Sequence, residues 1–314
     1  MTCQNIMSDS PYHIPALFEE AIESLDIKPG GTYIDATFGG GGHSRGIIEK
    51  LDKGIGRLFG VDQDEDAVNK AFSDERFTIV HSNFRYLKNF MRFYGVDSVD
   101  GILADLGVSF HHFDDPERGF SFRWDTRLDM RMNRRSSLTA EKILADYSLK
   151  QLTDIFRIYG ELKTAHKLAS AIVKTREQKA ISTASDLIET IKAYINPKAE
   201  KKELAMVFQA LRIEVNGELE ALKSFLFQAS ELLAPGGRLA IITYHSLEDR
   251  IVKNFMKSGN FSGEQEKDFF GNVNSPLKLI SSKPIVPTEE EIARNPRSRS
   301  AKLRVAVKTN ETPN

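Results

Sequence analysis

The sequence predicts an α/β fold in which helices cover both faces of a parallel sheet and one helical insertion interrupts the domain. Up to Asp105, short β-branched and apolar runs alternate with stretches of helical period. The alternation then stops for roughly a hundred residues and resumes near the C-terminus. Strands that alternate with helices form parallel sheets with two buried faces, so we expect one discontinuous α/β domain with an inserted all-helical domain.

The predicted strands are short apolar runs, most of which end at a glycine or an acid. They are Thr32 to Ala36, Arg57 to Val61, Phe77 to Val80, Val99 to Ala104, Arg238 to Tyr244, Lys278 to Ser281 and Ala301 to Val307. In the last strand the side chains alternate between an apolar face (Leu303, Val305, Val307) and a charged face (Lys302, Arg304, Lys308). Helices are predicted for Ser44 to Leu51, Asp64 to Phe72, Glu218 to Leu233, with Asn216 as N-cap, and Leu247 to Lys257.

The inserted segment has a helical period from Leu138 to Tyr194 and contains no strand candidate. Ser148 with Gln151, and Thr183 with Asp186, have the spacing of capping boxes at helix starts. We therefore place the discontinuous domain in residues 11–109 and 207–308 and the inserted helical domain in residues 110–206. Residues 1–10 and 309–314 are expected to be flexible tails.

The composition is that of a soluble protein with a sizeable core, because 40% of the 314 residues are hydrophobic and 28% are charged. The single cysteine, Cys3, cannot close an internal disulfide, and no apolar run approaches the about 20 residues that cross a bilayer. We expect a cytoplasmic protein without membrane contact. The net charge of −1 gives no support for nucleic-acid binding, so any RNA contact must come from local clusters.

Four glycines, Gly39 to Gly42, follow the first predicted strand and lead into a helix. Glycine lets the backbone turn sharply and lets a ligand touch the main chain, while a helix start offers amide groups to an anion. The dinucleotide and phosphate-loop motifs both fail, because Ser44 or Arg45 replaces the last glycine of the first and Ile47 replaces the lysine of the second. The turn therefore favours a cofactor with little phosphate, such as S-adenosylmethionine, and a purely structural turn is the alternative.

Polar residues lie near the carboxyl ends of four predicted strands: Asp35, Asp62, Asn83 and Asp105. Ligands of parallel sheets bind beyond the carboxyl ends of the strands, where an acid after the second strand accepts hydrogen bonds from ribose hydroxyls. Asp62 has this position, whereas Asp64 and Asp66 also suit a helix cap or a solvated acid. Phe84 could pack on an adenine ring, although core packing is the simpler interpretation of an isolated phenylalanine.

Several long motifs, in this order, resemble the ribosomal RNA small subunit methyltransferase H family. They are Thr37 to Ser44, Asp105 to Ser109, Asp114 to Phe122, Phe208 to Ile213 with Asn216, Tyr244 to Arg250, and Arg297 to Arg304. The resemblance implies a class I (Rossmann-like) S-adenosylmethionine-dependent methyltransferase fold. It also implies methyl transfer to N4 of a decoding-site cytosine in the 16S rRNA of the small ribosomal subunit, with the inserted domain recognising the substrate.

The resemblance assigns cofactor contacts to the glycine turn and to the strand ends: Gly41, Gly42, His43, Asp62, Phe84, Asp105 and His112. The family carries Gln at the position of His112, and this chain has Phe110-His111 where the family usually reads Ser-Pro. No metal-ligand spacing or cysteine cluster stands out, so no metal is expected. The sequence leaves open whether the protein forms a homodimer.

Asp105 and His245 are the candidate catalytic residues. The N4 lone pair of cytosine is delocalised into the ring, so a group that accepts a hydrogen bond from the amine can localise the pair and take up the proton. Asp105, at a strand end, suits this task, and His245 could orient the base or receive a proton. The alternative for His245 is simple packing beside a helix cap formed by Ser246.

Two segments are rich in arginine. The first also carries aromatic residues: Phe113, Arg118, Phe120, Phe122, Arg123, Trp124, Arg127, Arg131, Arg134 and Arg135; the second has Arg294, Arg297, Arg299, Lys302 and Arg304. Arginines pair with phosphates and aromatic rings stack on unpaired bases, so we expect residues 110–135 to help form an RNA cleft. Neutralisation by nearby Asp114, Asp115, Asp125 and Asp129 is the alternative interpretation.

Three other functions remain open at this point. A methyltransferase for another RNA, a protein or a small molecule would use the same cofactor turn. A nucleotide-cofactor oxidoreductase is disfavoured by the incomplete dinucleotide motif, and a non-catalytic RNA-binding protein is disfavoured by the combination of the turn with Asp62 and Asp105.

Overall fold

The computed structural model describes residues 15–107, 115–265 and 275–309. The chain forms two compact units, one made of residues 1–107 and 223–314 and the other of residues 108–222. The predicted boundary between residues 206 and 207 lies inside helix α10 (Glu200–Asn216), whereas the second unit includes all of that helix. None of the described helices is long and apolar enough to cross a membrane.

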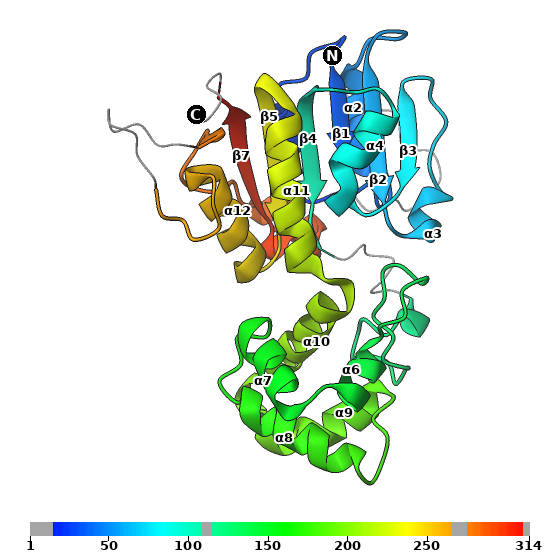
Figure 1. Ribbon diagram of the computed structural model, residues 1–314, viewed down its shortest axis with the longest axis vertical. Coiled ribbons are helices and arrows are strands. Elements are labelled where there is room, and N and C mark those ends of the chain that lie inside the picture. Colours follow the sequence, from blue (N-terminus) through cyan, green and yellow to red (C-terminus); the bar gives the residue numbers. More distant parts are fainter. Residues whose placement is uncertain (1–14, 108–114, 266–274, 310–314) are drawn as a thin grey trace. The chain divides into compact units, whose positions relative to one another are not determined.

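Within the described residues of the first unit, seven strands form one sheet in the order β3-β2-β1-β4-β5-β7-β6 (Figure 1). They are β1 (Thr32–Asp35), β2 (Arg57–Asp62), β3 (Phe77–His81), β4 (Val99–Asp105), β5 (Leu233–Thr243), β6 (Leu277–Leu279) and β7 (Lys302–Lys308). The first five strands of this order are parallel, and β7 runs antiparallel to both β5 and β6. The predicted α/β fold is confirmed.

Helices bury both faces of this sheet. They are α1 (Phe18–Ser24), α2 (Gly42–Lys50), α3 (Glu65–Val68), α4 (Leu87–Phe93), α11 (Glu218–Leu232) and α12 (Ser246–Ser258). The short helix α13 (Glu289–Arg294) has no buried residue. Ala240 and Ile242 of β5 share a core cluster with residues of α1 and α2. The alternate residues Leu239 and Ile241 point to the opposite face and are fully buried as well. Figure 1 shows α11 and α12 in front of the strands.

Two cationic residues of β7 pair with Asp249 of α12. Arg304 is only 5% exposed, and its Nε donates to Asp249 Oδ1 at 2.6 Å. Lys302 Nζ lies 3.4 Å from the same carboxylate. The predicted alternation of β7 is therefore present, and on its charged face Arg304 is buried whereas the Lys302 side chain remains 42% exposed. These two cations, which the sequence assigned to a basic cluster, are engaged within the unit.

The second unit is helical. Its helices are α6 (Ala140–Asp146), α7 (Leu149–Ile158), α8 (Ala165–Arg176), α9 (Ala184–Ile191) and α10. Their apolar faces form one core, which includes the fully buried Phe156, Leu168, Leu187 and Leu211. Both predicted capping boxes are confirmed, one at the start of α7 and one at the start of α9.

The sequence predicted that Asn216 caps the start of α11, but this residue is instead the last residue of α10. Its side chain connects α10 to the segment before α6. Its Oδ1 accepts from the Met132 amide at 2.8 Å, and its Nδ2 donates to the carbonyls of Met130 and Arg212 at 2.8 and 2.9 Å. One amide side chain thus satisfies three backbone groups, and Gly217, with φ of 57°, ends the helix.

We predict that Asn216→Ala lowers the free energy of unfolding by about 2–3 kcal/mol, because it removes three hydrogen bonds and leaves partly buried backbone groups unpaired. Asn89→Ala is the control, since Asn89 is exposed on α4 and its loss should cost less than about 0.5 kcal/mol. Urea denaturation followed by circular dichroism measures both. Equal losses in the two variants would contradict this role of Asn216.

Candidate functional site

The glycine turn joins β1 to α2 and needs glycine for two separate reasons. Gly39 and Gly41 have φ of 52° and 74°, in the left-handed region that other residues rarely adopt. A Cβ on Gly41 would also lie 2.8 Å from ring carbons of Phe38. Gly41 is the N-cap of α2 and supplies no side-chain cap to the helix start. The turn therefore presents backbone, rather than side chains, at the carboxyl edge of the sheet.

Asp62 braces this turn from the neighbouring strand. Its Oδ2 accepts from the Gly39 amide at 2.8 Å and its Oδ1 from the Asp64 amide at 2.9 Å. The carboxylate is thereby fixed beyond the end of the second strand, where an acid accepts hydrogen bonds from ribose hydroxyls in doubly wound folds. Asp64 instead caps α3 by accepting from the Asp66 amide. Asp62 therefore contacts the glycine turn, whereas Asp64 is a helix cap, which is the role that the sequence also allowed for it.

Asp35 fixes the base of the turn. It is 1% exposed, and its Oδ2 accepts from the Ser44 hydroxyl at 2.7 Å while Oδ1 accepts from the Thr37 amide at 3.2 Å. Burial raises the pKa of the Asp35 carboxyl to about 6, and the Ser44 hydrogen bond opposes this rise. Asp35 therefore holds the strand end against the helix start and is not open to solvent.

Asn83 and Phe84 follow β3 at the same edge. Asn83 Nδ2 donates to Gln63 Oε1 at 2.7 Å, and its own oxygen caps the short helical turn Phe84–Tyr86. The half-buried Phe84 ring packs edge-on against Phe225 of α11, with centroids 5.2 Å apart. Phe84 therefore packs in the core, as the simpler interpretation predicted, and it remains partly exposed.

Asp105 ends β4 directly beside the glycine turn. Its backbone amide donates to Thr37 Oγ1 at 2.6 Å, which ties the end of β4 to the first residue of the turn. Its Oδ1 accepts from the Tyr244 hydroxyl at 2.9 Å. Its Oδ2 lies 3.9 Å from Nδ1 of His43, beyond hydrogen-bond range. The carboxyl therefore has one oxygen held and one oxygen without a hydrogen bond from any described residue.

Burial is the main reason that the pKa of Asp105 rises to about 7. The nearby acids Asp35 and Glu248 raise it further, whereas the Tyr244 hydrogen bond lowers it. A carboxyl with this pKa exchanges its proton near neutral pH, which is the property required of a general base or acid. Among the predicted site residues, Asp105 is the one whose pKa is raised to near neutral pH.

His43 lies in the first turn of α2 and is 4% exposed. Burial lowers its pKa to about 4, so the imidazole is neutral at physiological pH. Its ring stacks on Phe18 with centroids 5.9 Å apart, and its Nε2 has no hydrogen-bond partner among the described residues. The structure thus brings His43, Asp105 and the glycine turn together.

His245 follows β5 and is the N-cap of α12, a position that the alternative interpretation predicted for Ser246. Its Nδ1 accepts from the Glu248 amide at 3.4 Å. Its Nε2 lies 3.0 Å from Glu248 Oε1, but the geometry does not form a hydrogen bond. The ring is therefore oriented by its own helix, and its catalytic role stays a prediction.

Tyr244 is a site residue that the sequence interpretation missed as a partner of Asp105. In the sheet, Asp105 pairs with Ile242, so Tyr244 emerges two residues farther along the adjacent strand. The signal was available, because both residues follow neighbouring strands at one edge. His112, a predicted cofactor contact, lies outside the described residues, as do Phe110 and His111.

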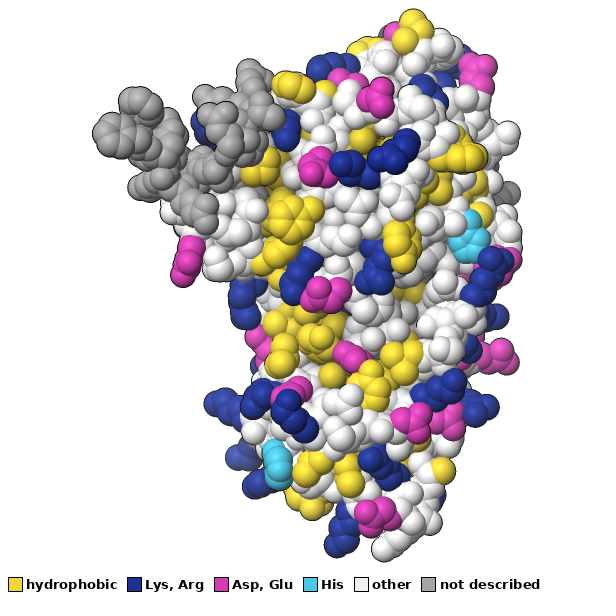
Figure 2. Space-filling view, viewed as in Figure 1, with side chains coloured by type: hydrophobic (Ala, Val, Ile, Leu, Met, Phe, Trp, Pro, Cys, Tyr) yellow, Lys and Arg dark blue, Asp and Glu magenta, His cyan; other side chains and the backbone are white. Residues whose placement is uncertain are grey.

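Most described arginines of the first cluster are engaged by local partners. Arg118 is 3% exposed and donates to the carbonyls of Arg131 and Met132. Arg131 forms a two-pronged pair with Asp129 at 2.7 Å, and Arg127 Nε lies 2.7 Å from Glu141. Figure 2 shows basic and acidic side chains interspersed on the face in view. The predicted neutralisation by a nearby aspartate is therefore present for Arg131, whereas Arg127 pairs with Glu141 instead and Arg118 donates to backbone carbonyls.

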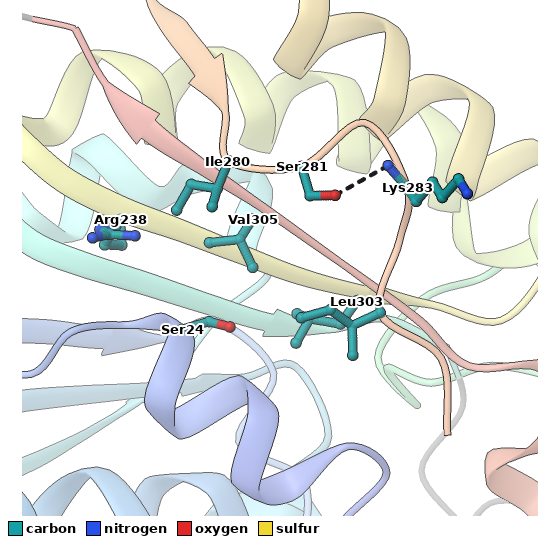
Figure 3. Close-up of a pocket in the computed structure, with 8 residues that line it drawn as sticks. Ser24, Arg238, Ile280, Ser281, Lys283, Leu303 and Val305 are labelled. Atoms are coloured by element: carbon teal, nitrogen blue, oxygen red, sulfur yellow. Dashed lines mark hydrogen bonds between the residues drawn. The ribbon is translucent and has the colours of Figure 1, made fainter. Parts of the chain in front are cut away.

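A separate cavity of the first unit is lined by residues of α1, β5 and β7 and of the segment that follows β6 (Figure 3). Its volume is about 120 Å³, and its lining includes Ser24, Arg238, Ile280, Lys283, Leu303 and Val305. Ligand sites usually enclose about 300–1,000 Å³. The cavity contains none of the predicted site residues and is too small for a nucleoside cofactor.

Comparison with known proteins identifies the family. The model of the MraW methylase family matches residues 10–309. The chain belongs to this family. The ribosomal RNA small subunit methyltransferase H of Phocaeicola vulgatus is 60% identical over 297 residues, or 95% of this chain and 97% of that protein. Its namesake from Parabacteroides distasonis is 60% identical over 301 residues, or 96% and 98% of the two chains.

Among solved structures, a putative rRNA-methylase from Clostridium thermocellum has a TM-score of 0.44 and 14% sequence identity, covering 94% of this chain and 97% of that chain. Membership of the MraW methylase family therefore depends on sequence similarity. It confirms the resemblance that the ordered motifs indicated.

We predict that Asp105→Asn raises the free energy of unfolding of this MraW methylase chain at pH 8 by about 2–3 kcal/mol. The gain is smaller than the full pKa shift would give, because 21% of the Asp105 side chain is exposed and solvent screens its charge. Since the folded-state pKa of Asp105, about 7, is raised, the wild type loses stability as pH rises from the unfolded pKa to about 7. The amide cannot ionise, so the variant should escape this loss. Urea denaturation at pH 5 and pH 8 measures the difference, and an equal decline in both proteins would contradict the assignment.

Proposed function

We infer that this chain is an S-adenosylmethionine-dependent methyltransferase that modifies N4 of a decoding-site cytosine in the 16S rRNA of the small ribosomal subunit. The observation that carries this inference is the Asp105 carboxyl, tuned to a pKa of about 7 and tied through Thr37 to the glycine turn. Relatives that carry the name ribosomal RNA small subunit methyltransferase H match nearly the whole chain at 60% identity.

The residues of the turn fit the cofactor. Its methionine carboxylate suits the backbone at Gly41, Gly42 and His43, where no side chain caps the helix start. Its ribose hydroxyls suit Asp62, and the exposed part of Phe84 suits its adenine. When bound, S-adenosylmethionine supplies an electrophilic methyl carbon attached to a sulfonium. Holding that carbon and the amine in line contributes proximity.

Asp105 supplies the acid–base chemistry. As the new N–C bond forms, the N4 amine becomes acidic and must release one proton. The Asp105 carboxylate accepts a hydrogen bond from the amine, localises its lone pair and then takes this proton. A pKa of about 7 lets Asp105 be ionised before the step and protonated after it. His245 remains a candidate for orienting the base.

We propose that the inserted domain recognises the RNA. Arg134, whose side chain is 59% exposed, lies 3.9 Å from Asp115 and makes a weak pair with it. Arg135 is exposed next to it. These two arginines are better placed for phosphate contacts than Arg118 or Arg131. We also propose a cytoplasmic location. Because the site residues all come from one chain, the proposed function applies equally to a monomer and to a homodimer.

Transfer of tritium from labelled S-adenosylmethionine tests the function. Purified small subunits, free 16S rRNA and a total protein extract are offered separately, and the modified nucleoside is identified by digestion. We expect N4-methylcytidine from small-subunit RNA. Label in protein or small molecules alone would favour a different methyltransferase, and no label despite cofactor binding would favour a non-catalytic protein.

We predict that Gly41→Ala weakens S-adenosylmethionine binding at least about tenfold, because the new Cβ collides with Phe38 and distorts the turn. Gly54→Ala is the matched control, since Gly54 has a similar φ of 82° but open space around it. Calorimetric titration measures both affinities. A Gly41→Ala protein that folds and binds as tightly as the control would remove the turn from the cofactor site.

We predict that reversing two charges, with Arg134→Glu and Arg135→Glu, weakens RNA binding and flattens its salt dependence by about two units of slope, since each phosphate contact contributes about one. Lys50→Glu with Lys53→Glu is the control, because both lysines are exposed and the net charge changes equally. Filter binding over a salt series gives both slopes. If the two double variants weaken RNA binding equally, the effect comes from net charge alone, and Arg134 and Arg135 are not specific phosphate contacts.

A further inference from the structure

Tyr244 makes the single hydrogen bond that any described residue donates to the Asp105 carboxyl. Its hydroxyl donates to Oδ1 at 2.9 Å. The other oxygen, Oδ2, faces His43 at 3.9 Å, too far for a hydrogen bond. A carboxyl with one oxygen held cannot rotate freely, so the direction of its second oxygen is set by the tyrosine.

Tyr244 is itself held in place from two sides. Its backbone amide donates to Glu248 Oε2 at 3.1 Å, which anchors the residue to the first turn of α12. On the other side the chain passes its ring at Gly107, where φ is 111° and a Cβ would lie 3.2 Å from a ring carbon. A glycine directly after the Asp105-Leu106 pair thus makes room for the ring that supports the carboxyl.

The hydrogen bond from Tyr244 also affects the pKa of Asp105, because the charged neighbours of this carboxyl are acids. Asp35 and Glu248 both disfavour ionisation of Asp105, and His43 is neutral because burial lowers its pKa to about 4. The Tyr244 hydrogen bond is the contact that lowers the pKa of Asp105. Burial, together with the acids Asp105, Glu248 and Glu291, raises the pKa of Tyr244 itself, so its hydroxyl remains protonated and acts only as a donor.

We propose that Tyr244 is the positioning residue of the methyl-transfer reaction, holding Oδ1 of Asp105 so that Oδ2 stays ionised and aimed at the cytosine amine. This inference rests on the proposed function. In the reaction the N4 lone pair forms the N–CH3 bond, the sulfur keeps the pair of the broken S–CH3 bond, and the N4 proton passes to Oδ2. Tyr244 touches neither the methyl group nor the amine and acts through Asp105.

The test compares Tyr244→Phe with Tyr147→Phe. Tyr147 donates in the same way to a carboxylate, Glu214 Oε1, at 2.7 Å, but lies in the helical unit. Both variants are checked for folding by circular dichroism and for S-adenosylmethionine affinity. The readouts are kcat/KM for methylation of small subunits from pH 5.5 to 9.5, and the titration of the Asp105 carboxyl by carbon-13 NMR, assigned with Asp105→Asn.

We expect Tyr244→Phe to move the acid limb of the kcat/KM profile upward by about one pH unit, because a hydrogen bond to the charged form is lost. Activity should then fall about tenfold at pH 6 and return to within about threefold of the wild type at pH 9. The NMR titration should move in the same direction. Tyr147→Phe should keep the wild-type profile and titration.

An unshifted acid limb in Tyr244→Phe, or a loss of equal size at every pH, would overturn the proposal, because either result means that Tyr244 does not control Asp105. Failure of the proposed function looks different. In that case wild-type protein methylates no small-subunit RNA, while the NMR titration still reports whether Tyr244 governs the Asp105 carboxyl.

Discussion

The site depends on one desolvated carboxyl group. Asp105 lies at the end of a central strand, beside two other acids, and water cannot stabilise its charge fully. Burial raises the pKa of this carboxyl to about 7, and the hydrogen bond from the Tyr244 hydroxyl limits the rise because it stabilises the charged form. The same balance that makes Asp105 costly for stability makes it able to exchange a proton near neutral pH.

The sheet explains why this carboxyl is close to a cofactor turn. The chain order reverses at β1, which lies between β2 and β4, and such a switch point opens a crevice beyond the carboxyl ends of the strands. The hydrogen bond from the Asp105 amide to Thr37 joins β4 to the turn, and the bond from the Gly39 amide to Asp62 joins the turn to β2. The proposed catalytic residue Asp105 and the proposed ribose ligand Asp62 are therefore both hydrogen-bonded to the same turn.

The strands, the capping boxes and the edge on which Asp35, Asp62 and Asp105 meet could be predicted from the sequence, because hydrophobic period and strand direction are local properties. The partners of long side chains could not. Asn216 has the composition of a helix cap, yet it binds a segment more than eighty residues away. Arg118 resembles a solvated arginine, yet it is buried against two carbonyls. Such pairings depend on tertiary packing, which no local pattern contains.

A crystal structure with S-adenosylhomocysteine and cytidine tests the central claim most directly, namely that one edge of the sheet binds the cofactor and presents a single carboxyl oxygen to the amine. We predict ribose hydroxyls on Asp62, the amino-acid end of the cofactor against Gly41 to His43, and the cytidine amine within hydrogen-bond distance of Asp105 Oδ2. A cofactor bound elsewhere, or a cytidine amine that contacts another residue while Asp105 faces away, would contradict the account.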